Sequence, residues 1–226
     1  MNENLIRLAR DSLMYAVKPF GVVPSDMKDF LENRVVRDKY ARLVDIAKSL
    51  DQLLSSTKPP TSNEVVMAVV TSGYLDPMTW QEAKANLNVF REAYDRLSDE
   101  EKIQVIRDVL RLLGDALSTP ARDVIIARGL DVIERLKATG DKSKAEVLRR
   151  FLMAIDDIYQ DKTDPVRRAA RDLAYLIPNL EDARLIAEAM LISSKYSPIA
   201  RQHFGYAYNT VDKKLRETMF NLLRAS

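Results

Sequence analysis

Acidic side chains gather in the segment Asp156-Asp157-Ile158-Tyr159-Gln160-Asp161. Asp157 and Asp161 are four residues apart and would share one face of a helix. Carboxylates paired in this way can hold Mg²⁺, which prefers oxygen ligands and shares them with the phosphates of a substrate. One prediction is therefore an enzyme or ligand-binding domain with an acidic magnesium site near Asp156, Asp157 and Asp161.

The same segment looks like the aspartate-rich motif of all-α isoprenoid synthases, a resemblance that implies magnesium ions bound against a substrate diphosphate. Two observations favour another interpretation. Ile155, Ile158 and Tyr159 define the apolar side of this helix, which turns Asp156 and Asp157 towards solvent, and no second aspartate-rich motif occurs in the chain. A solvated acidic helix face is the favoured interpretation.

Basic and aromatic residues are interleaved near the C-terminus. Basic groups neutralise phosphates and aromatic rings stack on bases. This pattern predicts, as an alternative function, nucleic-acid binding by the basic C-terminal helices. The residues of this candidate face are Arg201, Tyr206, Lys213, Lys214 and Arg216. A second basic cluster consists of Arg149, Arg150, Arg167, Arg168 and Arg171, and the aspartates between its members are expected to pair with it.

The chain has no cysteine and one histidine, His203. The lack of cysteine excludes a disulfide framework, a thiol nucleophile and a cysteine-ligated metal. Catalysis by His203 would need a nucleophile or carboxylate from elsewhere in the chain, so a packed or hydrogen-bonded histidine is favoured. The six glycines form no phosphate-binding loop. We therefore predict no catalytic residue and no cofactor.

Apolar residues recur every three or four positions along most of the chain, which is typical of amphipathic helices. We expect an all-α fold of nine to ten helices, arranged as an antiparallel multi-helix bundle or a short array of helix hairpins. The β-branched stretch 62–71 is compatible with a strand, but we expect a short buried helix. The expected helix signals are Ser25 as an N-cap, a Ser98–Glu101 capping box, a new helix opening at Thr119-Pro120, a stop at Gly140, and an opening at Ser197-Pro198.

Two local patterns resemble known motifs. The segment 163–173 has an Asp-Pro turn followed by Val-Arg-x-x-Ala, and resembles the second helix of a HEAT-type repeat, but no second copy recurs at a fixed period. Residues 69–90 resemble a helix-turn-helix with Gly73 in the turn. Trp80, at the start of the second helix, has the spacing of a core residue, which argues against a recognition helix.

The 226 residues carry a formal net charge of +2, with 46% hydrophobic and 30% charged residues. This balance favours a globular domain over disorder. We expect one domain over 1–226, the alternative being an N-terminal subdomain 1–56, a linker 57–61 and a main helical domain 62–226. High charge without cysteine would suit a thermophilic source.

The first residues lack the basic and apolar regions of a signal peptide, and no apolar run approaches the length of a membrane span. The expected location is the cytoplasm, without membrane association.

The leading functional hypothesis is a non-enzymatic helical protein–protein interaction or scaffold module, whose partner is another protein or a second copy of the chain. We also expect the last helix, about 198–223, to dock through its apolar stripe.

Overall fold

The computed structural model describes residues 2–71, 76–160, 164, 168–169, 171–172, 176–177 and 179–225. Within these residues the all-α prediction is confirmed, because they form nine α-helices and no strand. A single 3-10 turn, η1 (Lys18–Phe20), follows the first helix. The helices are α1 (Glu3–Val17), α2 (Met27–Glu32), α3 (Arg34–Leu53), α4 (Ser62–Thr71), α5 (Pro77–Tyr94), α6 (Asp99–Thr139), α7 (Lys142–Tyr159), α9 (Leu180–Tyr196) and α10 (Pro198–Arg224).

The contacts divide the chain into two compact units, Met1–Leu117 and Ser118–Ser226. Helix α6 contributes its first part to the first unit and its remainder to the second. The segment 57–61 lies inside the first unit. The division of the chain into folding domains at this segment stays a prediction.

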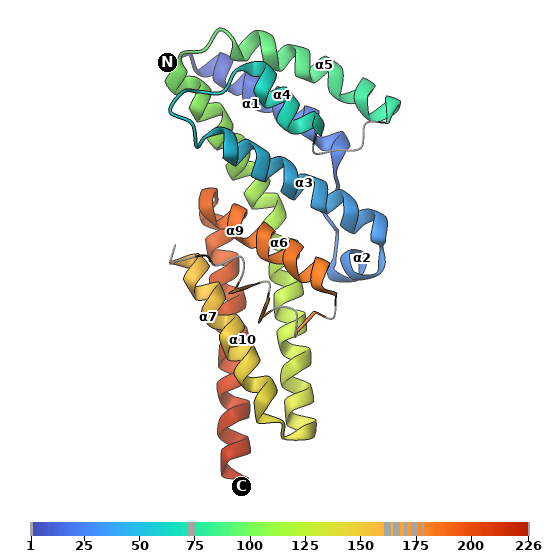
Figure 1. Cartoon of the computed structure of the whole chain (residues 1–226), viewed down its shortest axis with the longest axis vertical. Coiled ribbons are helices and arrows are strands. Elements are labelled where there is room, and N and C mark those ends of the chain that lie inside the picture. The colour runs from blue at the N-terminus through green and yellow to red at the C-terminus, as the bar shows by residue number, and fades with distance from the viewer. Residues whose placement is uncertain are drawn as a thin grey trace. The chain divides into compact units, whose positions relative to one another are not determined.

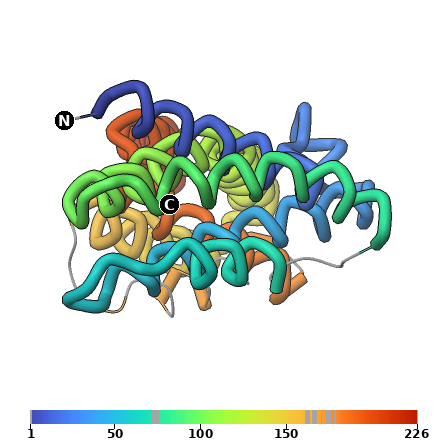
Figure 2. Tube along the Cα trace, turned by 90° about the horizontal axis from the view of Figure 1, so that it is seen from above, coloured from blue at the N-terminus to red at the C-terminus, as the bar shows by residue number. Residues whose placement is uncertain are grey.

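In the first unit, α1 packs against α5, and α4 contacts both α3 and α5. These four helices lie side by side and alternate in direction along the chain (Figures 1 and 2), as short connections between helices predict. The core of this unit contains the buried aromatic rings of Phe20, Phe30, Tyr40, Phe90 and Tyr94.

The predicted signals at the helix ends are mostly confirmed. Ser98 and Glu101 form the capping box: the Ser98 N–H donates to a Glu101 carboxylate oxygen over 3.0 Å, and the Glu101 N–H donates to the Ser98 hydroxyl over 3.3 Å. Backbone N–H donors of Ser98 and then of Asn2 lower the pKa of Glu101. Ser25 is not the N-cap of α2; the next residue, Asp26, accepts from the Asp29 N–H over 2.7 Å. A carboxylate at this position also favours the positive end of the helix dipole.

Helix α4 confirms that residues 62–71 form a short helix with a buried face. Trp80 is only half-buried, so its assignment to the core is wrong in part. The turn of the proposed helix-turn-helix, with Gly73, lies outside the described residues. So does most of the segment resembling a HEAT repeat, including Pro165, Val166 and Arg167.

The prediction that a new helix opens at Thr119-Pro120 is wrong, because α6 continues through Pro120 to Thr139. A proline inside a helix removes one backbone N–H donor and crowds the carbonyl four residues earlier. Buried Tyr40 supplies a donor nearby, since its hydroxyl donates to the Leu117 carbonyl over 2.7 Å. A tertiary hydrogen bond thus supports the backbone beside the proline.

In the second unit, α7 packs against α10, and α9 contacts both of them. Helix α10 runs antiparallel to α7 (Figure 1). Helix α6 approaches α10 closely: a Cβ atom built on Gly129 would lie 2.8 Å from a methyl group of Val211. Gly140 has a φ of 65° and ends α6, as predicted.

No helix in the described part of the chain combines the length and apolar character that crossing a bilayer requires.

Candidate interaction site on helix α10

Helix α10 begins as the sequence predicts, with Ser197 as the N-cap and Pro198 at the first helical position. The Ser197 hydroxyl accepts from the Ala200 N–H over 2.9 Å. One face of the helix docks on the second unit, which confirms the expected docking as far as Thr218. The buried residues of this face are Ala200, Phe204, Ala207, Val211, Leu215 and Thr218.

The opposite face of α10 has a regular pattern of its own. Eight positions, spaced alternately by three and four residues, are all exposed, and we call them the outer face. They are Ile199, Gln202, Tyr206, Asn209, Lys213, Arg216, Phe220 and Leu223. Four of them carry large apolar side chains: Ile199, Tyr206, Phe220 and Leu223, with exposed fractions of 48%, 62%, 60% and 59%. Such a three-four spacing is the pattern by which one helix packs along another.

The predicted nucleic-acid residues fall into three groups. Tyr206, Lys213 and Arg216 lie together on the outer face, whereas Lys214 is exposed about 100° around the helix from Lys213. The Arg216 guanidinium donates to the Asp212 carboxylate over 2.7 Å, one helical turn away. This ion pair offsets one of the positive charges that a phosphate would need.

Arg201 belongs to a different environment. Its Nε–H donates to the Ser194 carbonyl over 2.6 Å, and a terminal nitrogen lies 3.4 Å from the Lys195 carbonyl. These carbonyls are in the last turn of α9, where the helix leaves acceptors without internal partners. Arg201 therefore closes the end of α9 and holds the turn into α10.

A cavity of about 280 Å³ lies beside this turn. It is lined by Ile158, Tyr159, Gln160, Leu191, Ser194, Lys195 and Arg201. The ammonium of Lys195 lies 5.6 Å from the centre of the Tyr196 ring, a cation–π arrangement. Arg201 bonds the end of α9 and Lys195 lies over the ring of its neighbour Tyr196, which fits a structural role for both cations.

His203 lies one turn into α10 and is half-buried. Its Nδ1 is 2.7 Å from the hydroxyl of Ser118 on α6, so the structure does bring a hydroxyl to the histidine. Ser118 is fully buried, however, and a nucleophile must reach its substrate. The arrangement is that of a buried hydrogen bond between two helices.

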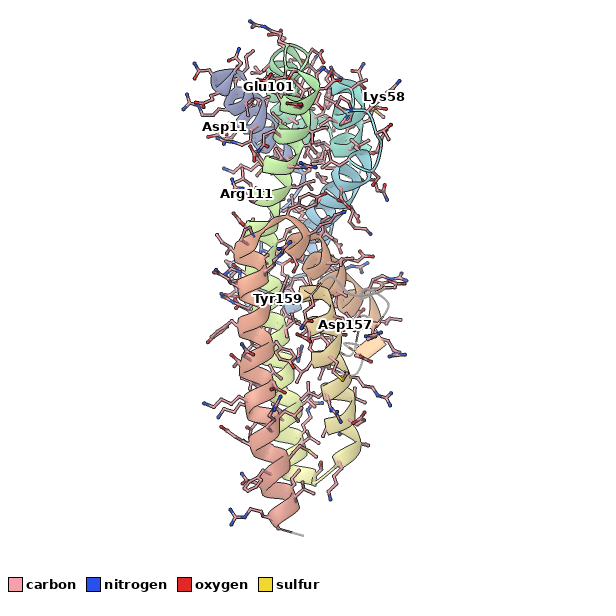
Figure 3. All side chains as sticks on the ribbon, turned by 90° about the vertical axis from the view of Figure 1, so that its left-hand side faces the viewer. Asp11, Lys58, Glu101, Arg111, Asp157 and Tyr159 are labelled. Carbon is pink, nitrogen blue, oxygen red and sulfur yellow. The ribbon has the colours of Figure 1, made fainter. Side chains whose placement is uncertain are left out.

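The acidic segment at the end of α7 is engaged by neighbouring side chains. The Gln160 amide donates to both carboxylate oxygens of Asp156, over 2.9 and 3.0 Å, and Asp157 forms an ion pair with Arg168. Figure 3 shows the side chains of Asp157 and Tyr159 on this helix. Asp161 lies outside the described residues. Within the described residues no group of three or more metal-ligating side chains forms.

The second basic cluster is also paired with acids. Arg149 and Arg150 lie 3.9 and 3.4 Å from the carboxylate of Glu146, and Arg171 lies 3.3 Å from that of Asp172. Arg167 is outside the described residues. The cluster therefore has the salt-bridged character that the sequence favours.

The outer face is the feature that sequence reasoning missed. Its spacing is present in the sequence, but the stronger apolar stripe through Phe204, Val211 and Leu215 has the same periodicity and determines which side is buried. Only the structure shows that one of these two rows is buried and the other is exposed. No protein family model, curated protein or solved structure matches the chain.

Proposed function

We propose that this protein is a non-enzymatic helical module that binds another protein chain through the outer face of α10. The observation that carries the proposal is the row of eight exposed positions with helix-packing spacing, four of them large and apolar. Exposed apolar side chains that share one face of a helix stabilise an association when a partner covers them.

Two features favour a protein over a nucleic acid at this face. Ile199, Phe220 and Leu223 offer no charge to a phosphate, and they occupy both ends of the row. Arg216 already pairs with Asp212 within the helix. Lys213 and Tyr206 remain compatible with nucleic acid, which is therefore an outcome that the experiment must be able to detect.

The test is photo-crosslinking in cells that naturally make the protein. A benzophenone amino acid replaces Phe220 in one variant and Tyr15 in a matched control. The two positions are well matched, because each ring is about equally exposed (60% and 59%) and each has a cation above it, from Arg224 and Lys18 respectively.

We expect protein adducts from position 220 and few from position 15. Adducts that nuclease digestion shortens would instead support the nucleic-acid alternative. Equal yields of protein adduct from the two positions, or none from position 220, would contradict the proposal.

A further inference from the structure

We propose that the chain covering the outer face of α10 is a second copy of this protein, with the two α10 helices antiparallel. This inference rests on the proposed function and names its partner. The reason is that the outer face is complementary to itself when one helix is reversed.

The complementarity follows from the register. If Ile199 is placed opposite Leu223 of the second copy, the alternating spacing brings the other six positions into register as well. Gln202 then faces Phe220 of the second copy, Tyr206 faces Arg216, and Asn209 faces Lys213. Each of these contacts occurs twice, as a two-fold axis near the middle of the helix requires.

Three of the four kinds of facing pair have favourable chemistry, and the fourth places the Gln202 amide beside the Phe220 ring. Ile199 and Leu223 bury apolar surface at both ends of the pair. The Arg216 guanidinium can stack on the Tyr206 ring of the second copy while it keeps its bond to Asp212. The Asn209 amide oxygen can accept from the Lys213 ammonium.

A parallel pairing of the same faces would be unfavourable. Lys213 would then lie opposite Lys213 of the second copy, and Arg216 opposite Arg216, so that like charges meet at the centre. The parallel arrangement would also align the two helix dipoles, whereas the antiparallel one opposes them. Polar residues in the middle of the row therefore determine the direction of the pair, a role that polar residues have at helix–helix seams.

The absence of native cysteine makes a direct test straightforward. Ile199→Cys and Leu223→Cys are prepared as separate single-cysteine proteins, and each is oxidised alone and as a mixture. A disulfide forms only when the two Cα atoms come within about 7 Å. The control mixture pairs Leu223→Cys with Tyr15→Cys, whose side chain is exposed on α1.

We expect the disulfide-linked dimer in the mixture of Ile199→Cys and Leu223→Cys, and not in either protein alone. Adding Phe220→Asp to both should weaken the dimer at least about tenfold. Crosslinking of each variant alone would overturn the antiparallel arrangement. A mixture that crosslinks no better than the control would overturn self-association.

The outcomes for the two proposals are distinguishable. If position 220 gives photo-adducts with a different protein while the cysteine mixture fails, the proposed function stands and the second copy is excluded as the partner. If position 220 gives no protein adducts at all, the proposed function itself fails.

Discussion

Among individual residues, Asp172 stands out as a buried carboxylate that is incompletely satisfied. Its side chain is 3% exposed, and Arg171 lies 3.3 Å from one of its oxygens. Its other oxygen has no hydrogen-bond partner among the described residues. Burial raises the pKa of this carboxyl, although Arg171 and other nearby arginines act in the opposite direction.

The raised pKa predicts a pH-dependent effect of Asp172→Asn. A carboxyl that binds its proton more tightly in the folded state stabilises the fold at low pH, and this stability is lost as the pH rises through the raised pKa. At pH 7 the buried charge therefore costs stability, and the uncharged amide should raise Tm by up to about 4 °C. The gain should vanish at about pH 3, below the usual aspartate pKa. A lower Tm at pH 7 would show that the arginines outweigh burial.

Tyr40 makes a buried hydrogen bond to the backbone of α6, three residues before Pro120. Its hydroxyl is fully buried, which raises its pKa, and it donates to the Leu117 carbonyl. Tyr40→Phe leaves that carbonyl buried with one bond fewer and should lower the free energy of unfolding by about 1–3 kcal/mol. Chemical denaturation measures the loss. The double variant Tyr40→Phe with Pro120→Ala should show the two effects added together, because the N–H restored at position 120 reaches the Ala116 carbonyl and not that of Leu117. A fully stable Tyr40→Phe protein would contradict this role.

At the scale of the helices, the contact between α6 and α10 depends on the lack of a side chain at Gly129. In a helix interior, alanine is more favourable than glycine by about 1 kcal/mol. Here the added methyl would overlap the β-branched Val211, which cannot swing away. At this position the close approach of α6 and α10 therefore favours glycine, although alanine has the higher helix propensity.

We therefore expect Gly129→Ala to lower the free energy of unfolding by about 1–3 kcal/mol, against the trend for helices. Val211→Ala creates a cavity and should also destabilise the protein. The double variant should lose less free energy of unfolding than the two single variants lose together, because the methyl added at position 129 fills the space that Val211→Ala leaves. Additive losses in denaturant melts would contradict a direct clash.

The helices could be predicted from sequence because periodicity and capping are local properties. The Ser98–Glu101 box and the Ser197-Pro198 opening require only a few neighbouring residues. The continuous α6 could not be predicted, because Thr119-Pro120 carries the same local signal as the true helix start at Ser197-Pro198. The sequence also did not reveal that His203 meets Ser118, because these residues lie 85 positions apart in the chain.

The candidate site shows the same limit. Tyr206, Lys213 and Arg216 were predicted to act together, and they do share one face of α10. That Ile199, Phe220 and Leu223 belong to that face depends on which side of the helix is buried, a result of tertiary packing. The basic residues alone suggest a nucleic acid as the partner. The presence of these apolar residues on the same face favours a protein instead.

At the scale of the whole molecule, exposed apolar side chains occur on several of the described helices, and α10 carries four in one row where α1 carries two, Leu8 and Tyr15. Val35 on α3, Met67 on α4 and Met153 on α7 are exposed as separate residues, which is ordinary for a protein surface. The four on α10 share one row with the polar residues between them. This contrast predicts that a charge on the outer face affects association, whereas a charge on a comparable ring elsewhere does not.

Sedimentation velocity over a range of protein concentrations tests the central claim about the partner most directly, that a second copy of this protein covers the outer face of α10. The wild type is compared with Phe220→Asp and with the matched control Tyr15→Asp. We predict that the wild type and the control both shift from 25.7 kDa towards twice that mass as concentration rises, while Phe220→Asp remains at 25.7 kDa. Identical sedimentation of all three proteins, with no effect of the charge at position 220, would contradict self-association through the outer face.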